Sequence, residues 1–326
     1  MKFLKELAGL AAGLSMIAMA GVASAEEFKL SPEIAQHAKD GKKLVFAVSY
    51  HDPSVAFANP IRDGVAKAAT ELGVEATFVG PVGGGAEKQI AELETIIEKG
   101  VDGLAISSAS TDALAPLINR TLAKGIPVIA FNTDNPKSER LTFIGQDLVL
   151  SGETVAKELV KYMGDKGKIV ITSVDTAAQW SLDREGGARK ELAKYPGIEV
   201  VGIVNTGTES QQIYGTIENT FAANPDLTGI ISLECCSFPQ IGLYLKRNPR
   251  SGDFAAVGFD LLEQTLTLIK DGYLDSTISQ NPYAQGYKSV EVLTDIVKNG
   301  KMPPKMIDTG AEIVDKTNVD QYIGKQ

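Results

Sequence analysis

The residues of this chain that could do chemistry are few. Its only cysteines, Cys235 and Cys236, are adjacent and follow Glu234, and its only histidines are His37 and His51. These residues lack the spacing of a zinc site, so we expect no metal and no cofactor. A serine nucleophile would need His51 as its base, because His37 precedes the first apolar run, and no G-x-S-x-G motif is present. Paired carboxylates could still hydrolyse a glycoside.

The cysteine pair has two interpretations, which the sequence leaves open. Adjacent Cα atoms are about 3.8 Å apart across a trans peptide, which is below the usual disulfide range of about 4.4–6.8 Å. A Cys235–Cys236 disulfide would therefore be strained, as functional sites sometimes are, and would form a rigid apolar surface. The alternative is a pair of reduced, partly buried thiols.

The elements that must position these residues follow from the hydrophobic pattern. Apolar runs of strand length alternate with helix-period segments; for example Ile90, Leu93 and Ile97 share one helical face. We expect strands at 44–49, 76–80, 103–108, 126–132, 168–173, 199–204, 229–233 and 255–260, and helices at 60–72, 87–100, 112–124, 184–194, 211–223, 240–246 and 261–270. Strands that are apolar throughout, with crossover helices between them, form parallel sheets buried on both faces. Two such sets predict two doubly wound α/β lobes.

Composition and charge narrow the class of protein. The 326 residues carry a formal net charge of −9 and are 44% hydrophobic. The length predicts two domains, the hydrophobic content predicts a sizeable core, and the acidic balance argues against a nucleic-acid partner. The glycine-rich segment 80–85 lacks the spacing of a nucleotide-binding loop and predicts a flexible turn.

The N-terminus has the pattern of a secretory signal. Lys2 and Lys5 precede an apolar stretch over 7–22, and Ala23-Ser24-Ala25 supplies small residues for cleavage. This stretch is shorter than the roughly 20 residues that a membrane-spanning helix needs. We therefore expect cleavage after Ala25 and a mature protein in the periplasm.

Polar residues cluster where the expected strands end. In an open parallel sheet, ligands bind beyond the carboxyl ends of the strands. The residues there are rich in carboxylates, amides and hydroxyls: Tyr50, His51, Asp52, Ser107, Ser108, Asn132, Thr133, Asp134, Val174, Asp175, Thr176, Glu234, Cys235, Cys236 and Asp260. Such groups suit a sugar or polyol, whose hydroxyls donate and accept. Phe57, Phe259 and Trp180, the last in a polar loop after a strand, could cover its C–H faces; core packing is the alternative for the phenylalanines.

Seven segments together carry a family resemblance: NPIRDGVAKAATELG, GVDGLAISS, KGIPVIAFNTD, FIGQDLVLSG, REGGARKEL, AAVGFD and GYLDSTISQNPYAQGYKSVEVL. On these segments the chain resembles the periplasmic sugar-binding proteins of ABC importers, the ribose-binding-like group with the type I fold. The resemblance implies two doubly wound parallel-sheet α/β lobes joined by a three-crossing hinge, with one small molecule bound between them. We expect residues 1–25 to be the signal peptide, 26–146 and 281–308 the N-terminal lobe, and 147–280 and 309–326 the C-terminal lobe.

The resemblance also implies residue roles. Phe57 matches an aromatic residue that covers the sugar, and Asp260 matches an aspartate that binds hydroxyls. Leu182 or Asp183 stands where ribose binders place a ligand arginine, whereas Arg184 matches an arginine at a helix start. We expect the cysteine pair to line the cleft opposite Phe57, with Glu234 aimed at a ligand hydroxyl. The set expected to bind ligand is His51, Phe57, Asn132, Asp134, Gln146, Gln179, Trp180, Asp183, Glu234, Cys235, Cys236, Phe259, Asp260 and Gln280.

These observations predict a monomeric periplasmic receptor that captures a monosaccharide or polyol and delivers it to a membrane ABC permease. A furanone-type signal or an amino sugar also fits a site with acids and little base. A secreted sugar-modifying enzyme on a similar scaffold is a separate alternative. A cytoplasmic repressor domain is disfavoured, because no basic helix-turn-helix segment precedes Leu44.

Overall fold

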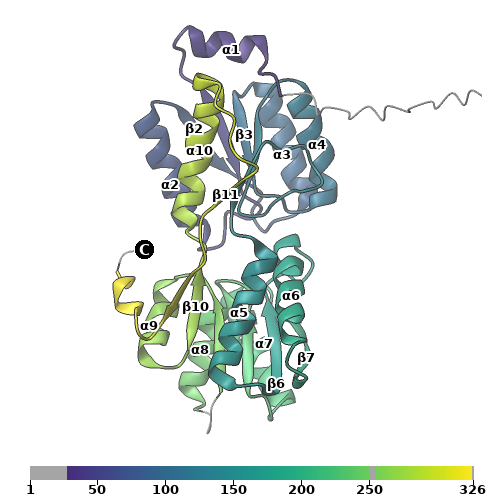
Figure 1. Ribbon diagram of the computed structural model, residues 1–326, viewed down its shortest axis with the longest axis vertical. Coiled ribbons are helices and arrows are strands. Elements are labelled where there is room, and N and C mark those ends of the chain that lie inside the picture. The colour runs from purple at the N-terminus through teal and green to yellow at the C-terminus, as the bar shows by residue number, and fades with distance from the viewer. Residues whose placement is uncertain (1–27, 250–253, 325–326) are drawn as a thin grey trace, which may run out of the picture.

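The computed structural model describes residues 28–249 and 254–324, which form two α/β lobes stacked along the long axis (Figure 1). Each lobe contains a six-stranded sheet with helices on both faces. The doubly wound two-lobe fold expected from the sequence is thus confirmed. The expected signal peptide, residues 1–25, lies outside the described residues.

The first sheet has the strand order β11-β5-β4-β3-β1-β2, and all its neighbouring strands are parallel. Its inner strands are buried on both faces, which explains their uninterrupted apolar sequences. The strands are β1 (Val45–Ser49), β2 (Glu75–Val79), β3 (Gly103–Ile106), β4 (Val128–Phe131), β5 (Phe143–Gly145) and β11 (Met306–Asp308). The helices of this lobe are α1 (Pro32–Lys39), α2 (Ala58–Leu72), α3 (Ala86–Lys99), α4 (Thr111–Ala123) and α10 (Pro282–Asn299).

The second sheet has the order β12-β10-β9-β8-β6-β7, in which β12 alone pairs antiparallel. Its strands are β6 (Lys166–Ser173), β7 (Gly197–Asn205), β8 (Gly229–Ser232), β9 (Ala255–Phe259), β10 (Ser276–Ser279) and β12 (Glu312–Asp315). The helices of this lobe are α5 (Leu148–Met163), α6 (Gln179–Leu192), α7 (Ser210–Ala223), α8 (Ser237–Arg247), α9 (Glu263–Asp271) and the 3-10 helix η1 (Val319–Gln321).

The chain passes between the two sheets three times. These crossings join β5 to α5, β10 to α10, and β11 to β12. Figure 1 shows α10 and β11 returning to the upper lobe, so that a late part of the sequence completes the first lobe. The three crossings meet at the waist of the molecule.

Helices α5 and α6 pack closely because glycines face the contact. A Cβ added to Gly152 would lie 2.1 Å from the carbonyl oxygen of Arg184, and one added to Gly187 would lie 2.0 Å from that of Val149. Glycine is required where backbones approach this closely. The contact fixes the N-terminal half of α6, which carries Arg184 and Trp180, against the lobe.

Helices α6 and α8 begin three or more residues earlier than their sequence pattern predicts. Helix α6 begins at Gln179, not at 184, so Trp180 lies in its first turn and the expectation of a polar loop is wrong. Helix α8 begins at Ser237, directly after the cysteine pair. The first turn of α6 contacts the other lobe, where Gln179 accepts a hydrogen bond from the Thr111 hydroxyl, whereas the first turn of α8 is buried in the core of its own lobe through Phe238.

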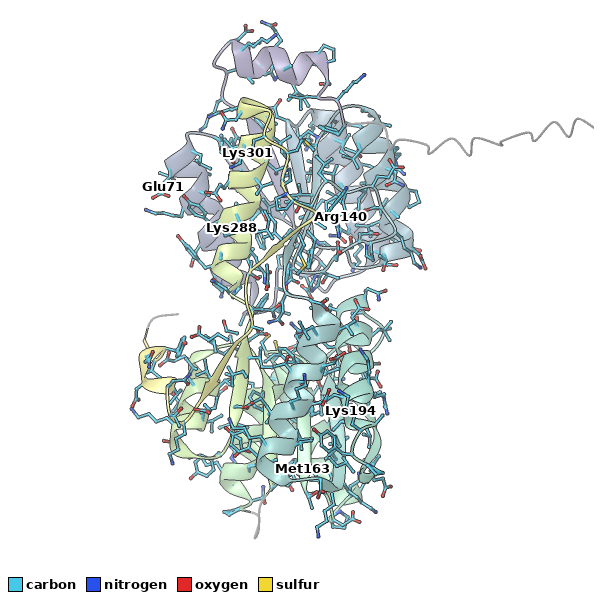
Figure 2. All side chains as sticks on the ribbon, viewed as in Figure 1. Glu71, Arg140, Met163, Lys194, Lys288 and Lys301 are labelled. Atoms are coloured by element: carbon cyan, nitrogen blue, oxygen red, sulfur yellow. The ribbon has the colours of Figure 1, made fainter. Side chains whose placement is uncertain are left out.

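Charged side chains cover the outer surfaces of both lobes (Figure 2). Lys301 and Lys288 lie on the upper lobe, and Lys194 lies on the lower lobe; their side chains are 73%, 41% and 59% exposed. Within the described residues, no helix is both long and apolar enough to span a membrane.

Candidate functional site

A cavity of about 500 Å³ lies between the lobes, where the carboxyl ends of both sheets meet. This is the position that open parallel sheets provide for ligands. Of the residues expected to bind ligand, nine line it: His51, Phe57, Asn132, Trp180, Glu234, Cys235, Cys236, Asp260 and Gln280. The structure therefore gathers side chains that are up to 229 residues apart in the chain, from His51 to Gln280, around one space.

The wall formed by the N-terminal lobe is largely aromatic, with Asp52 as its carboxylate. Tyr50 directly follows β1, and its ring centroid lies 4.2 Å from that of His51 and 6.3 Å from that of Phe57. The Nδ1 atom of His51 lies 2.8 Å from the hydroxyl of Ser107. Burial lowers the pKa of His51 to about 4, despite the nearby carboxylates of Asp52 and Asp175. The imidazole is therefore uncharged at neutral pH.

Asn132 follows β4 on the same wall, with φ of 58°, in the left-handed region that asparagine tolerates better than most residues. It is 6% exposed. Its Nδ2 atom donates to Gln285 Oε1 at 3.0 Å and to Gln280 Oε1 at 3.5 Å. Its Oδ1 atom accepts from the hydroxyl of Ser107 at 3.4 Å. The protein itself thus orients this amide.

The opposite wall, from the C-terminal lobe, carries charge. Asp260 follows β9 with φ of 72° and is 4% exposed. Gln280 Nε2 donates to Asp260 Oδ1 at 2.9 Å. Burial raises the pKa of Asp260 to about 6, while the nearby Arg184 opposes this shift. The carboxylate is ionised at pH 7 but poorly compensated, and ligand hydroxyls would stabilise it.

Arg184 is the buried cation of this wall, and it was not among the residues expected to bind ligand. Its Nη1 atom donates to the carbonyl of Leu233 at 2.8 Å, and its guanidinium lies 4.0 Å from the ring centroid of Phe259. Its Nε atom has no hydrogen-bond partner among the described residues. Phe259, expected to cover a sugar face, is instead fully buried and does not line the cavity. Arg184 stacks on this ring and lines the cavity itself.

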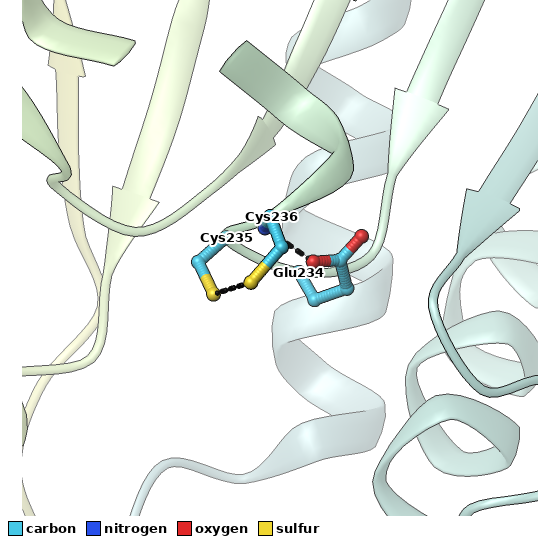
Figure 3. A group of neighbouring side chains, drawn as sticks. All are labelled: Glu234, Cys235 and Cys236. Carbon is cyan, nitrogen blue, oxygen red and sulfur yellow. Dashed lines mark hydrogen bonds between the residues drawn. The ribbon is translucent and has the colours of Figure 1, made fainter. Parts of the chain in front are cut away.

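The cysteines are free thiols, with their sulfur atoms 2.8 Å apart (Figure 3). The adjacent disulfide, one of the two alternatives left open by the sequence, is not present. The hydrogen bond with Cys236 and burial both raise the pKa of Cys235, so its thiol stays protonated. Both cysteines line the cavity with Phe57, and they also pack against the hydrophobic core of the opposite lobe.

The carboxylate of Glu234 caps a helix. It accepts a hydrogen bond from the backbone N–H of Cys236 (Figure 3) and another from that of Ser237 at 3.1 Å. These groups begin α8, where unpaired N–H groups favour a negative charge. Glu234 therefore lines the cavity, but its carboxylate faces the start of α8, and its expected contact with a ligand hydroxyl stays a prediction.

Glu234, Cys235 and Cys236 also hold potential metal-ligand atoms within 4.8 Å of one another. The helix cap occupies both oxygens of Glu234, and adjacent cysteines do not have the spacing typical of zinc sites. We assign no metal to this group.

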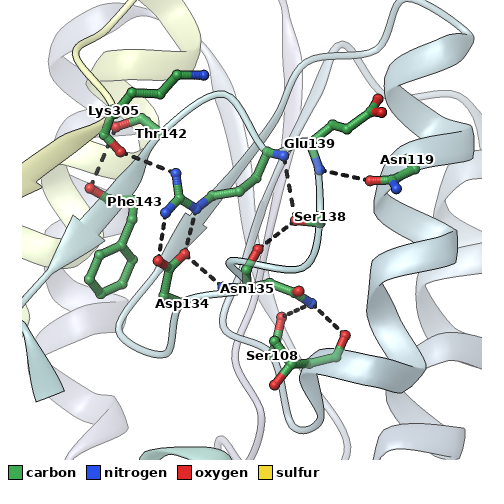
Figure 4. Close-up of polar contacts among 11 residues, drawn as sticks. Ser108, Asn119, Asp134, Asn135, Ser138, Glu139, Thr142, Phe143 and Lys305 are labelled. Atoms are coloured by element: carbon green, nitrogen blue, oxygen red, sulfur yellow. Dashed lines mark hydrogen bonds and ion pairs between the residues drawn. The ribbon is translucent and has the colours of Figure 1, made fainter. Parts of the chain in front are cut away.

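Asp134 does not reach the cavity. Its carboxylate forms a two-pronged ion pair with Arg140 and accepts from the backbone N–H of Asn135 at 2.6 Å (Figure 4). Arg140 also donates to the carbonyl of Lys305 at 3.1 Å. Asp134 therefore stabilises the loop after β4 and joins it to the segment before β11. The signal missed in the sequence is the arginine six residues later.

Three further residues expected to bind ligand also lie outside the cavity lining. Gln146 Nε2 donates to the carbonyls of Ser279 and Gly310, within the hinge. Gln179 lies at the rim of the cleft, where its Oε1 accepts from the Thr111 hydroxyl of the other lobe at 2.8 Å. Its Nε2 donates to Asp183, the third residue, at 2.8 Å. Gln179 thus connects the lobes and Gln146 bonds within the hinge, while Asp183 is bonded to Gln179 of its own helix.

Comparison with known proteins agrees with this geometry. The profile of the periplasmic binding protein domain matches residues 46–302. The chain belongs to the periplasmic binding protein family. The xylose/arabinose-binding protein XylF of Sulfolobus acidocaldarius is 27% identical, over 86% of this chain and 73% of that protein. The ribose import binding protein RbsB of Bacillus subtilis is 23% identical, over 85% of this chain and 89% of that protein.

Among solved structures, an ABC transporter solute binding protein from Burkholderia graminis in complex with D-arabinose is similar to this chain. It is 31% identical with a TM-score of 0.80, and the match covers 86% of this chain and 97% of that one. Family membership makes the protein a substrate-binding protein and places it in the periplasm or outside the cell.

Several lining residues of this periplasmic binding protein were not in the expected set. Tyr50 and Asp175 follow strands, so their positions were a usable signal. The segment 83–85 also lines the cavity, although its sequence predicted only a flexible turn. Asn205 and Gln212, from the end of β7 and from α7, complete the outer part. Asn205 directly follows the strand expected at 199–204, so its position was also a usable signal, whereas Gln212 lies inside α7.

Proposed function

We propose that this protein captures a pentose or a related polyol in the interlobe cavity and delivers it, chemically unchanged, to a membrane ABC permease. The observation that carries the proposal is the pair of buried strand-end residues Asn132 and Asp260. They come from opposite lobes, line one cavity and are linked through Gln280. Closure of two lobes on a ligand requires groups from both lobes.

The chemistry of the cavity fits a polyhydroxylated molecule. Asp260 accepts from hydroxyls, and Arg184, with an unused Nε donor, suits a ring or carbonyl oxygen. Tyr50, Phe57 and Trp180 provide apolar surface for C–H groups. The relatives named for xylose, arabinose and ribose, and the similar structure with D-arabinose, favour a pentose within this class.

A hydrolytic enzyme is the second candidate, because His51 and Ser107 lie 2.8 Å apart as a possible base and nucleophile. Three observations disfavour it. Ser107 is fully buried and does not line the cavity. Its hydroxyl oxygen accepts from the backbone N–H of Thr133 at 3.3 Å. The low pKa of His51, about 4, makes it a weak base.

An amino sugar or a furanone-type signal stays an alternative ligand. Glu234 and Asp260 face a single buried cation, Arg184, so the C-terminal wall carries a net negative charge when both carboxylates are ionised. That negative charge would favour a ligand with an ammonium group, such as an amino sugar. A furanone carries no charge and would depend on hydrogen bonds with its hydroxyl groups alone.

We further propose that the signal peptide is cleaved after Ala25 and that the mature protein is a monomer. The lobes would divide as expected, with 26–146 and 281–308 in one and 147–280 and 309–326 in the other. Mass spectrometry of periplasmic protein and light scattering would test the first two points.

A thermal-shift screen of the mature protein against pentoses, hexoses, polyols and amino sugars tests the ligand class, because binding to the folded state raises the melting temperature. We expect a pentose or pentitol to give the largest shift and calorimetry to show one saturable site. Ligand recovered after long incubation should be unaltered. Failure of every polyhydroxylated compound to bind, or recovery of a chemically changed one, would overturn the proposal.

A further inference from the structure

The three crossings of the hinge are joined by buried side chains. Thr309, in the crossing from β11 to β12, donates from its hydroxyl to the carbonyl of Gln280, in the crossing from β10 to α10, at 2.9 Å. Gln146, in the crossing from β5 to α5, donates to the carbonyls of Ser279 and Gly310 at 3.3 and 3.0 Å. Each crossing is therefore bonded to the other two.

Gln285 is the residue that joins this hinge to the cavity wall. It lies in the first turn of α10 and is fully buried. Its Nε2 atom donates to the carbonyl of Gln280 at 2.7 Å and contacts the hydroxyl of Thr309 at 3.5 Å. Its Oε1 atom accepts from Asn132 Nδ2 at 3.0 Å. One amide thus binds two crossings and a residue of the cavity wall.

The position of Gln285 distinguishes it from the ligand contacts. Asn132 and Gln280 line the cavity, but Gln285 does not. It belongs to α10, which packs against α2 in the N-terminal lobe, while its bonds to Gln280 and Thr309 reach segments whose backbone must turn when the lobes move. Hinge motion occurs through dihedral changes in a few such residues.

We propose that Gln285 is a positioning residue, which limits how far the lobes separate and holds the Asn132 amide in the orientation that a ligand needs. The second role rests on the proposed binding function, whereas the first does not. A ligand can shift the equilibrium between open and closed lobes only by its differential affinity for the two states. A hinge that limits how far the lobes open therefore shortens the movement that ligand binding must reverse.

The test compares Gln285→Leu with Gln89→Leu. Gln89 is the matched control, because it is also fully buried and also makes three hydrogen bonds with its side chain. Those bonds join Ser49, Ser107 and Ala109 within the N-terminal lobe and do not reach the hinge. Both variants should lose a similar amount of stability in chemical denaturation.

The readout is the distance between the lobes in the ligand-free protein. Exposed Lys194 and Lys301, on opposite lobes (Figure 2), would be replaced by a noncanonical amino acid that carries a nitroxide, which leaves the native cysteines unlabelled. Double electron–electron resonance then reports the distribution of distances between the two nitroxides. We expect Gln285→Leu to broaden the distribution toward longer distances and Gln89→Leu to leave it unchanged.

A wild-type distribution in folded Gln285→Leu, or equal broadening in both variants, would overturn the proposal. If Gln285→Leu does not fold, Gln285→Glu at pH 8 is judged by the same criterion, because it keeps the acceptor for Asn132 and loses the donor to Gln280 and Thr309. This measurement needs no ligand, so its failure is distinct from a failure of the proposed sugar binding. With the sugar that gives the largest thermal shift, Gln285→Leu should also lower affinity several-fold more than Gln89→Leu.

Discussion

Asn132 and Asp260 occupy matching places in the two lobes but differ in how the protein satisfies them. Each follows an inner strand, each has a positive φ, and each is nearly buried. The Asn132 amide bonds to Gln285, Gln280 and Ser107, all within the protein. Asp260 accepts from Gln280 but carries a charge that burial disfavours, as its raised pKa shows. The amide serves as an anchor, and the carboxylate retains an unmet demand for donors that a ligand would supply.

Replacing Asp260 with asparagine would place an amide at the matching position of both walls. We expect this change, measured in the free energy of unfolding, to be the largest effect. The folded state raises the pKa of Asp260 from 3.8 to about 6, so between these pH values the folded protein binds more protons than the unfolded chain. Stability contributed by this group therefore falls as pH rises through that window. A shift of about two units corresponds to about 3 kcal/mol.

Asp260→Asn should accordingly raise the free energy of unfolding at pH 7 by up to about 3 kcal/mol and have little effect below pH 4. Urea denaturation at both pH values would measure this. Asp134→Asn is the control with the opposite sign, because Asp134 is paired with Arg140. An equal change for Asp260→Asn at pH 4 and pH 7 would contradict the comparison.

Truncation of the two residues should separate their contributions to binding. Asp260→Ala should weaken binding of the best sugar by roughly 1.5–3 kcal/mol, the range for a hydrogen bond to a charged group. Asn132→Ala should cost about 0.5–1.5 kcal/mol, because its bond to the ligand is neutral. Calorimetry on folded variants gives both values. Equal losses would show that the charge has no special role.

The pH dependence of binding follows from the same carboxylate. Hydroxyls that donate to Asp260 favour its ionised form, so the affinity should fall as pH drops below about 6. The same titration on Asp260→Asn should be flat in this range. A wild-type affinity that is constant from pH 7 to pH 5 would argue against direct contact with Asp260.

Replacing the cysteine pair should give the smallest change in ligand affinity. As free thiols, Cys235 and Cys236 contribute apolar contact across the cleft, so replacing both with serine should change affinity by less than about 1 kcal/mol. Intact-mass analysis of unreduced protein should give the mass of the dithiol. A mass about 2 Da lower would establish the Cys235–Cys236 disulfide instead. Reduction of that disulfide should then weaken ligand binding.

The expected strands were placed well because their burial leaves a strong signal. Inner strands such as β3 and β8 are apolar at every position apart from glycine or serine. The ends of β4, β9 and β8 locate Asn132, Asp260 and the cysteines, respectively, at the cavity. Asn205 was missed although a strand was expected directly before it, at 199–204. A strand end, however, carries several polar residues, and its sequence does not say which of them face the ligand.

Asp134 and Arg184 show where that limit lies. Both are charged residues near the cleft, and the sequence favoured Asp134 over Arg184 for binding. Arg140 draws the Asp134 carboxylate away, while the stacking of Arg184 on Phe259 turns the guanidinium toward the cavity. Each outcome depends on one neighbouring side chain whose direction follows from packing.

The sequence by itself determined two doubly wound lobes, most of their inner strands and the edge at which a ligand would bind, because hydrophobic periodicity directly reflects the burial of each element. It did not predict strands β5, β10, β11 and β12 or helices α5 and α10, which form and follow the hinge crossings. The tertiary structure alone decided which polar groups form hydrogen bonds within the protein and which remain available to a ligand. The bond between Asn132 and Gln285 joins residues 153 positions apart, and that of Gln280 to Asp260 crosses from hinge to lobe. Such pairs form only when two distant segments are packed together, so no local pattern of residues predicts them.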